Sequence, residues 1–345
     1  YGPRIHGLSE NKEHLDNIIN TGHLAEGEWN DKLAKYVKEL TQSKYSTVTN
    51  SNGAGMVALL SLFRFFKKRS HVLIQANTMY GVKAMVPASG CELYGYINCQ
   101  VNTLMPSLQD IVNAISSIDR FDKKKLIILL SHIGGIINPD IKKISKLCKN
   151  EDIILLEDCA HSFGATLDGD HSGLFGDAGV YSFYATKAIM AGEGGVVVTN
   201  NSEIGEMLEK YVIYDRFDQD LGIGNNIRIS EIQALFCFSI VKEWNEIIAN
   251  KKVIAERYID LCNKNNISYI NQESRLQSGN YYKFILFSEN QNIYQKYPKI
   301  KTTTSAVYDY SIGIHNVVAN SHLCLPIWYG QEEDITDKVC EELQK

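Results

Sequence analysis

The sequence lacks the cysteine pairs and the long apolar runs that mark secreted and membrane proteins. None of its eight cysteines forms a C-x-x-C pair, and most lie in apolar surroundings, which favours reduced thiols over a disulfide framework. No uninterrupted apolar span is long enough for a transmembrane helix, and nothing in a chain that begins at Tyr1 is typical of a signal peptide. We therefore expect a cytoplasmic protein.

A surplus of positive charge is also lacking. The formal net charge is −5 and the sequence pI is about 6.0, which gives no support for a nucleic-acid or anionic-membrane surface. The basic clusters at 67–69 and 123–125 flank apolar segments and are expected on solvated faces. The scattered histidines and cysteines show no metal-ligand spacing. We therefore expect no nucleic-acid partner, no membrane partner and no metal site.

Apolar segments of strand length alternate with helical segments through the middle of the chain. At 345 residues, 44% of them hydrophobic, the chain can bury a substantial core. The predicted strands are 72–75, 91–97, 125–130, 153–156, 180–184 and 195–199, and the predicted helices among them are 81–88, 107–118 and 140–149. This alternation is typical of a parallel sheet covered on both faces. The sequence predicts an α/β fold with a mostly parallel central sheet sandwiched by helices.

Both ends of the chain depart from this alternation. The elements predicted there are helices at 10–20, 29–41 and 51–66, a long helix at 229–251, a strand at 281–287 and a closing helix at 335–343. The long helix is interpreted as a connector towards a second domain, and no internal repeat or low-complexity linker is present. We expect an N-terminal arm and a large domain over residues 1–240, and a smaller α+β domain over residues 241–345.

One lysine stands in surroundings unlike those of a solvated lysine. Lys187 follows a β-rich segment and lies among apolar residues and hydroxyls, 29 residues after the acidic pair Glu157-Asp158. That pair closes the apolar run 153–156, and open α/β sheets place their ligand chemistry at such strand ends. An amine able to form a Schiff base and a carboxylate able to hold a protonated ring nitrogen are the minimal apparatus of a pyridoxal-phosphate enzyme.

Each of these residues also has an ordinary structural interpretation. Asp158 could cap the segment that follows its strand, and His161 could be a core histidine rather than a cofactor contact. Ser182 could be a plain strand residue or a hydroxyl donor to a cofactor phosphate, and Lys187 could extend to solvent. The glycines at 192–195 favour the functional interpretation, because glycine lets a backbone approach another group closely.

A glycine-containing turn, Ser51-Asn-Gly-Ala-Gly55, opens the apolar helix that runs to Phe66. Free N–H groups and the helix dipole point the same way at such a turn, which makes it a ready anion site. Glycine turns before helices are common, so this turn alone does not establish a phosphate site.

The order and spacing of these segments resemble the DegT/StrS-type sugar aminotransferases, a family of fold-type-I pyridoxal-phosphate enzymes, over nearly the whole chain. The segments that carry the resemblance are 21–27 (family S-G-x-L-x-x-G), 51–55, 131–135 with Pro139 and Asp140, 157–165 (E-D-A-A-Q/H-x-x-G-A), 176–187 (G-D-x-x-x-F-S-F-x-x-T-K), 224–234 (G-x-N-x-R) and Leu325-Pro326. The lysine motif is highly specific in this context, and the ordered set is more so.

The resemblance implies roles for the residues around the cofactor ring. Lys187 would be the Schiff-base lysine and the general acid/base for the proton shift. Asp158 would pair the pyridine nitrogen, and His161 would contact the ring or its phenolic oxygen. The cofactor is thus expected to be pyridoxal 5'-phosphate.

The resemblance also implies how the phosphate and the amino donor are held. The phosphate would lie on the backbone amides of Gly53 and Ala54 and on Ser182. Asn226 would reach it from the partner subunit, which makes a homodimer with active sites at the subunit interface obligatory for activity. Arg228 would hold the carboxylate of the donor in a bidentate pair.

Two departures from the family pattern affect the expected cofactor contacts. The family has S-G-T at the phosphate loop, whereas this chain has Asn52-Gly53-Ala54, so the threonine hydroxyl is lost. The aromatic residue that stacks on the ring follows the threonine matched by Thr78, but Met79 stands there, with Tyr80 next. Met79, Tyr80 or His161 could supply the stacking contact, and the sequence does not decide among them.

The expected activity is transfer of an amino group from L-glutamate to a keto sugar carried on a nucleotide. Related sugar dehydratases carry histidine at the lysine position, so Lys187 favours transamination. Within the family, a 4-keto-6-deoxyhexose that gives a viosamine- or perosamine-type product ranks first. A 3-keto sugar or a keto-inositol is the runner-up, and a catalytically silent relative that only binds the cofactor is the alternative of another class.

The sugar contacts are expected near residues 299–322. Tyr308, Tyr310 and His315 are the candidates there, against ordinary aromatic packing in the small domain.

Overall fold

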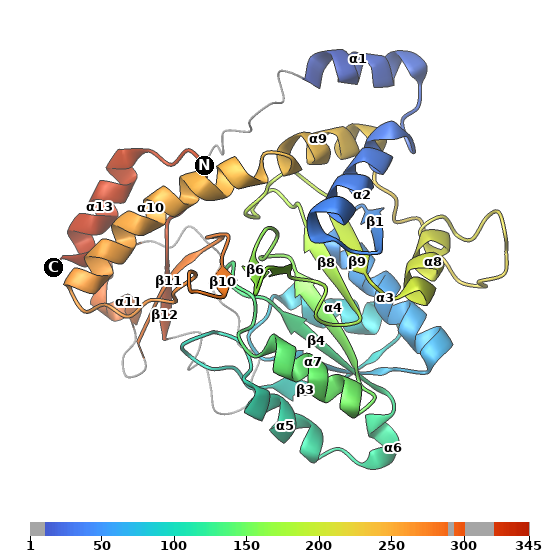
Figure 1. Ribbon diagram of the computed structural model, residues 1–345, viewed down its shortest axis with the longest axis horizontal. Helices are drawn as coiled ribbons and strands as arrows, with labels where there is room; N and C mark the ends of the chain where they lie inside the picture. Colours follow the sequence, from blue (N-terminus) through green and yellow to red (C-terminus); the bar gives the residue numbers. More distant parts are fainter. Residues whose placement is uncertain (1–10, 289–292, 301–320, 345) are drawn as a thin grey trace.

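A seven-stranded sheet forms the centre of the protein in a computed structural model that describes residues 11–288, 293–300 and 321–344 (Figure 1). Its strand order is β1-β9-β8-β5-β4-β2-β3. The strands are β1 (Tyr45–Thr49), β2 (His71–Gln75), β3 (Glu92–Ile97), β4 (Leu126–Ser131), β5 (Ile154–Cys159), β8 (Ala178–Ser182) and β9 (Gly195–Thr199). Neighbouring strands from β3 to β8 are parallel, and β9 runs antiparallel to β8 and β1. The expected mostly parallel sheet is confirmed.

The sheet is apolar on both faces because helices cover both. Along β4, Ile127 and Leu129 pack into one core, and Ile128 and Leu130 pack into another, as the two-residue period of a strand requires. Helices α3 (Asn52–Lys67), α4 (Tyr80–Ala88) and α8 (Ser202–Tyr211) line the first core. Helices α5 (Leu108–Ser116) and α7 (Ile141–Asn150) line the second. On the same side, near β8 and β9, the sheet is covered by α1 (Lys12–Thr21), α2 (Glu28–Thr41) and α9 (Glu231–Val241).

The helices of this part alternate with the strands along the chain. They are α1 (Lys12–Thr21), α2 (Glu28–Thr41), α3 (Asn52–Lys67), α4 (Tyr80–Ala88), α5 (Leu108–Ser116), α6 (Arg120–Lys123), α7 (Ile141–Asn150), α8 (Ser202–Tyr211) and α9 (Glu231–Val241). Within the described ranges, none of the helices is long and apolar enough to cross a membrane.

The C-terminal part has a core of its own. It contains α10 (Trp244–Lys264), β11 (Phe284–Phe287), α11 (Ile293–Lys296), β12 (His322–Leu325) and α13 (Glu333–Leu343). The strands β11 and β12 form an antiparallel pair, and α13 lies alongside α10 (Figure 1). A small three-stranded sheet connects this part to the part that contains the large sheet. It pairs β10 (Gln277–Ser278) with β6 (Thr166–Leu167), which in turn pairs with β7 (Asp170–His171).

The structure differs from the prediction at two elements. The helix predicted at 229–251 is two helices, because α9 ends at Val241 and α10 begins at Trp244. Glu243 turns the chain with φ −93° and ψ 11°, without the glycine or proline that would have marked the break. The segment Tyr45–Thr49, between the helices predicted at 29–41 and 51–66, is strand β1, which was not predicted. The predicted domain division at 240/241 falls at the end of α9 and stays a prediction.

Candidate active site

Asp158 lies at the carboxyl end of β5, between the parallel strands β4 and β8. The side chain is buried, with 6% of its surface exposed. Its Oδ1 accepts hydrogen bonds from Asn52 Nδ2 (3.1 Å) and from the Ala160 amide (3.1 Å), and its Oδ2 accepts one from Ser131 Oγ (3.0 Å). A turn rather than a helix follows β5, so Asp158 is not a helix N-cap.

The two side chains that hold Asp158 are themselves held. The Asn52 amide also donates to the Val180 carbonyl (2.7 Å), and the Ser131 hydroxyl is 2.8 Å from Thr78 Oγ1. These residues come from the start of α3, the end of β4, β8 and the loop after β2. Because four segments converge on it, the Asp158 carboxylate has a fixed orientation at the edge of the sheet.

Lys187 lies in a loop after β8, and backbone hydrogen bonds within the loop hold it closed. Phe183 donates to Gly194, and Ala191 donates to the Phe183 carbonyl, both at 2.9 Å. The lysine is buried, with 9% exposed, so it does not extend to solvent. Burial lowers the pKa of its amine to about 8, which the Asp158 charge opposes and the Lys283 charge reinforces.

The Lys187 amine has no hydrogen bond or ion pair within the part of the chain that the structure describes. Its Nζ lies 5.6 Å from the centre of the Tyr282 ring, within cation–π range. A buried amine without an acceptor is costly for folding, and a depressed pKa makes it a better nucleophile and base. This combination is typical of a functional lysine.

His161 lies between the lysine and the C-terminal part of the molecule. Its ring centre is 4.3 Å from that of Tyr282 at an interplanar angle of 39°, and its Nδ1 accepts a hydrogen bond from the Gly134 amide (3.4 Å). Burial, followed by the charges of Lys187 and Lys283, holds the pKa of His161 well below its usual range. The imidazole is therefore neutral near pH 7.

The expected phosphate residues come together around Gly195. Ser182 pairs with Gly195 across β8 and β9, and a side chain on Gly195 would collide with the backbone of Ser51 at the start of α3. This is the close backbone approach that the glycines at 192–195 predicted. Ser51 is the N-cap of α3 and its hydroxyl accepts from the Ala54 amide (3.1 Å). The Ala54 amide is thus already engaged, which the sequence did not indicate.

The candidates for the stacking contact differ in exposure. Thr78 belongs to the Asp158 network, while Met79 and Tyr80 after it are 46% and 63% exposed at the start of α4. His161 is the only one of the three candidates whose ring packs on Tyr282 among the described contacts. The structure leaves all three at the same edge of the sheet without deciding which of them stacks.

Asn226 and Arg228 do not reach Lys187 within one chain. Asn226 is exposed and bridges to Ile213 by its backbone, and Arg228 Nε pairs with Glu26 Oε1 at 2.8 Å. The Arg228 Nη1 atom is buried without a hydrogen-bond partner in the described residues. Neither side chain forms a hydrogen bond or ion pair with the described residues around Asp158. Their predicted roles, for Asn226 a reach from the partner subunit and for Arg228 a bond to the donor carboxylate, stay predictions.

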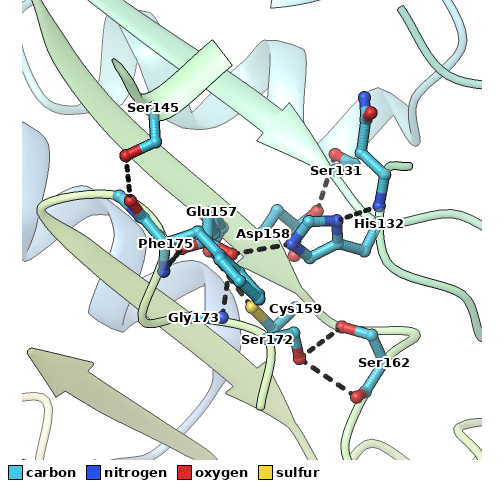
Figure 2. Close-up of polar contacts among 12 residues, drawn as sticks. Ser131, His132, Ser145, Glu157, Asp158, Cys159, Ser162, Ser172, Gly173 and Phe175 are labelled. Carbon is cyan, nitrogen blue, oxygen red and sulfur yellow. Dashed lines mark hydrogen bonds and ion pairs between the residues drawn. The ribbon is translucent and has the colours of Figure 1, made fainter. Parts of the chain in front are cut away.

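Glu157, the other half of the acidic pair, has a different role that the sequence did not reveal. It is fully buried, and its two oxygens accept from His132 Nε2 (2.8 Å) and from the amides of Gly173 (2.9 Å), Phe175 (2.7 Å) and Gly176 (2.7 Å) (Figure 2). His132 Nδ1 accepts from the Asn138 amide (3.1 Å), so Nε2 carries the proton.

His132, Glu157 and Cys159 also bring three potential metal ligands within 4.8 Å, a cluster that the sequence spacing did not show. Two donors already occupy each oxygen of Glu157, and His132 donates rather than coordinates. Burial, reinforced by the charge of Glu157, raises the pKa of the Cys159 thiol well above its usual range, which disfavours the thiolate that metals bind. The cluster is a hydrogen-bonded core and does not fit a metal ion.

Tyr308, Tyr310 and His315 lie outside the described residues. The roles of other residues near Lys187 were missed in the sequence, above all Asn52 and Ser131 around Asp158 and Tyr282 and Lys283 around the amine. Asn52 and Ser131 lie in segments that carry the family resemblance, but nothing in those segments indicated that they bind Asp158. Tyr282 and Lys283 belong to no motif, because they arrive from a segment far away along the chain.

The residues at this strand edge fit a pyridoxal cofactor. They supply a buried amine without an acceptor among the described residues, a carboxylate whose orientation is set by donors on both oxygens, and a neutral histidine beside them. A serine and a helix N-terminus lie at Gly195, where an anionic group can be bound by hydroxyl and amide donors.

Comparison with known proteins gives the same assignment. Residues 7–319 match the sequence model of the DegT/DnrJ/EryC1/StrS aminotransferase family. The chain is similar to a GDP-perosamine synthase of Escherichia coli O157:H7, at 26% identity over 80% of this chain and 73% of that protein. It is also similar to a UDP-4-amino-4,6-dideoxy-N-acetyl-beta-L-altrosamine transaminase of Helicobacter pylori, at 25% identity over 72% of this chain and 66% of that one.

Solved structures share the fold. The aminotransferase TlmJ of Streptoalloteichus hindustanus superposes with a TM-score of 0.84 at 17% identity, covering 96% of this chain and 94% of its own. The match over most of the chain and the donor set at the end of β5 agree: this enzyme belongs to the DegT/DnrJ/EryC1/StrS aminotransferase family, and its cofactor is pyridoxal 5'-phosphate.

Proposed function

We propose that the enzyme transfers an amino group from L-glutamate to a keto sugar carried on a nucleotide. The observation that carries the proposal is the buried Lys187 amine, whose pKa is about 8 and which has no acceptor in the described residues, beside the oriented carboxylate of Asp158. Two of the similar proteins carry names that contain a GDP-linked and a UDP-linked amino sugar. These names support a nucleotide-linked acceptor.

Each residue of the site has a proposed part in this reaction. Lys187 would anchor the cofactor. Its amine would also take the proton from the substrate carbon and deliver it to the second carbon atom of the proton shift. Asp158 would pair the ring nitrogen, with Asn52 and Ser131 keeping its oxygens aimed. His161 would contact the ring as a neutral imidazole. When bound, the cofactor supplies the electron sink that makes the substrate's C–H proton removable.

The remaining contacts bind the anionic ends of cofactor and donor. Gly53, Ala54 and Ser182 would hold the phosphate at the start of α3, where the Ala54 amide would exchange its bond to Ser51 Oγ for one to the phosphate. Asn226 would join them from the partner subunit, and Arg228 would hold the glutamate carboxylate, so we propose an obligatory homodimer in the cytoplasm. The proposed bond between Arg228 and the glutamate carboxylate is supported by Arg228 Nη1, which is buried without a hydrogen-bond partner among the described residues. Such a buried guanidinium nitrogen is costly until an anion reaches it.

We further propose that the acceptor is a 4-keto-6-deoxyhexose and the product a viosamine- or perosamine-type sugar. The name of the Escherichia coli protein supports this ranking. A 3-keto sugar or a keto-inositol remains the runner-up. Incubating the enzyme with glutamate and a panel of keto-sugar nucleotides, and following products by mass and NMR, distinguishes them: amination of a 3-keto substrate alone would overturn the ranking.

Reductive trapping tests the chemistry itself. The purified protein should absorb in the visible range with bound cofactor, and borohydride should fix the cofactor to Lys187, located by peptide mass spectrometry. Lys187→Ala should abolish both trapping and turnover, whereas Lys251→Met should still be trapped. A colourless protein that takes up no cofactor, or Lys187→Ala with full turnover, would sink the enzyme assignment in favour of a silent relative.

A further inference from the structure

Three buried lysines surround one aromatic ring beside the site. The Nζ atoms of Lys187, Lys283 and Lys251 lie 5.6, 5.7 and 5.9 Å from the ring centre of Tyr282. Lys283 and Lys251 are 2% and 3% exposed. Lysine is rarely buried so deeply, and the proposed function uses only Lys187.

The Tyr282 ring also contacts the rest of the site. It packs on the His161 ring, with 4.3 Å between the two ring centres. Burial raises the pKa of the Tyr282 phenol to about 12, so it stays uncharged at physiological pH. Tyr282 is therefore an uncharged ring that packs on His161 and lies within cation–π range of the three lysine amines.

The large domain holds the segment that carries Tyr282 and Lys283. Asn280 donates through its side chain to the carbonyls of His161 (2.8 Å) and Phe163 (2.9 Å), and its backbone amide donates to Gly135 (3.0 Å). The Lys283 amide donates to the Gly134 carbonyl (3.0 Å). These bonds fix the segment against the loops that follow β4 and β5, so the position of Lys283 relative to Lys187 is built into the fold.

The charged groups that face Lys187 come from three elements. Asp158 approaches from β5, Lys283 from the segment before β11, and Lys251 lies across the Tyr282 ring on α10. After burial, the charges that act on the pKa of Lys187 are Asp158, which raises it, and Lys283, which lowers it. Lys283 also lowers the pKa of His161. Burial alone lowers the pKa of Lys251, to about 7.

We propose that Lys283 is a positioning residue of the transamination site, presenting a second positive charge to the Lys187 amine beside Tyr282 so that the uncharged amine is favoured. This rests on the proposed role of Lys187. The uncharged amine carries the lone pair that bonding to the cofactor and accepting a proton both need. A neighbouring cation is a known means of activating a lysine. Asp158 opposes it, and both charges act on an amine whose pKa burial has already lowered.

Competitive acetylation of the cofactor-free protein tests the proposal. Lys187 reactivity towards limiting acetic anhydride, followed over pH by peptide mass spectrometry, reports its pKa without any turnover. Lys283→Met and Lys283→Gln should raise the Lys187 pKa by about one unit, the size expected for a charge several ångströms away at a protein's effective dielectric constant. Lys283→Arg keeps the charge and should restore the unaltered titration.

Lys251→Met is the matched control. It removes a lysine equally buried and at nearly the same distance from the Tyr282 ring. Because burial lowers the pKa of Lys251 to about 7, its amine is mostly uncharged near pH 8, where Lys187 titrates. Its Lys187 titration should equal that of the unaltered protein. Far-UV circular dichroism confirms that each variant is folded, and the glutamine and arginine variants preserve polarity if the methionine variant does not fold.

Two results would overturn the proposal. One is an unmoved Lys187 titration in both Lys283→Met and Lys283→Gln, and the other is an equal shift in Lys283→Gln, Lys283→Arg and Lys251→Met. Failure of the proposed function is separate: it appears as an unaltered protein in which borohydride traps no cofactor on Lys187. A protein that is trapped normally, yet whose Lys187 titration ignores Lys283, contradicts this inference alone.

Discussion

Glu157 and Asp158 are neighbours on β5, and they face opposite sides of the sheet with opposite surroundings. Both oxygens of Glu157 are saturated by four donors, three of them backbone amides of the loop 173–176. Asp158 is held by two side chains and one amide, and the Lys187 amine lies within range of its charge. A carboxylate saturated by backbone donors secures a loop, whereas one oriented by side chains beside an unpaired amine is available for chemistry.

The sharpest test of this contrast is to neutralise the functional acid. Asp158→Asn should lower turnover by about 10²- to 4 × 10³-fold, because losing one partner of a buried ion pair costs roughly 3–5 kcal/mol and about 1.4 kcal/mol is tenfold in rate. Steady-state kinetics with saturating cofactor measures it, with exposed Glu151→Gln as control. Activity within a few-fold of the unaltered enzyme would contradict the pairing role of Asp158.

Neutralising the neighbouring acid should instead damage the fold. Glu157→Gln turns an acceptor oxygen into an NH₂ group that faces buried N–H donors, and should lower the free energy of unfolding by about 3 kcal/mol. Urea unfolding followed by circular dichroism measures it. Asp158→Asn should cost less, since the Asn52 and Ser131 side chains can adjust. Equal losses in the free energy of unfolding for Glu157→Gln and Asp158→Asn would contradict the proposed difference between the two acids.

The two acids should also differ in their effect on the lysine's titration. The Asp158 charge raises the pKa of Lys187, so Asp158→Asn should move it from about 8 to a lower value, by about one unit. The amine would then stay uncharged to lower pH, and its acetylation rate would fall off at lower pH than in the unaltered protein. Glu157→Gln should leave the midpoint in place. An upward shift in Asp158→Asn would contradict the assignment of charges.

The smallest effects come from the serines on either side. Ser131→Ala removes one donor to Asp158, and should weaken cofactor affinity about tenfold, since a hydrogen bond to a charged group is worth about 1.5 kcal/mol. Ser145→Ala, which removes the bond to the Phe175 carbonyl on the other face, should leave cofactor affinity unchanged. Fluorescence titration of cofactor-free protein gives both values, and equal effects would remove the distinction.

The sequence was sufficient for the parts of this arrangement that depend on local pattern. Buried strands read as apolar runs, so β4, β5 and the acidic pair at the end of β5 were predictable, as was the lysine loop with its glycines. The different fates of Glu157 and Asp158 were partly readable too, because adjacent strand residues face opposite sides. The saturation of Glu157 was not, since it depends on how the loop 173–176 lies against the strand.

The contacts that distinguish Asp158 from Glu157 could not be predicted from local sequence patterns. Asn52 reaches Asp158 across 106 residues of sequence, and Tyr282 and Lys283 approach Lys187 from the C-terminal part of the chain. Single side-chain hydrogen bonds of that range leave no periodicity in a sequence. The break between α9 and α10 escaped for a different reason, because Glu243 turns the chain without a glycine or proline.

The saturation of Glu157 has a consequence for the order of folding. Its partners are 16, 18, 19 and 25 residues away along the chain, whereas the Asn52 bond to Asp158 spans 106. Closing a long loop costs more entropy than closing a short one, and contacts of long sequence separation form slowly. We expect β4, β5 and the loop 173–176 to assemble as an early unit. The carboxylate that meets the cofactor would receive its final orientation only when α3 docks, late in folding.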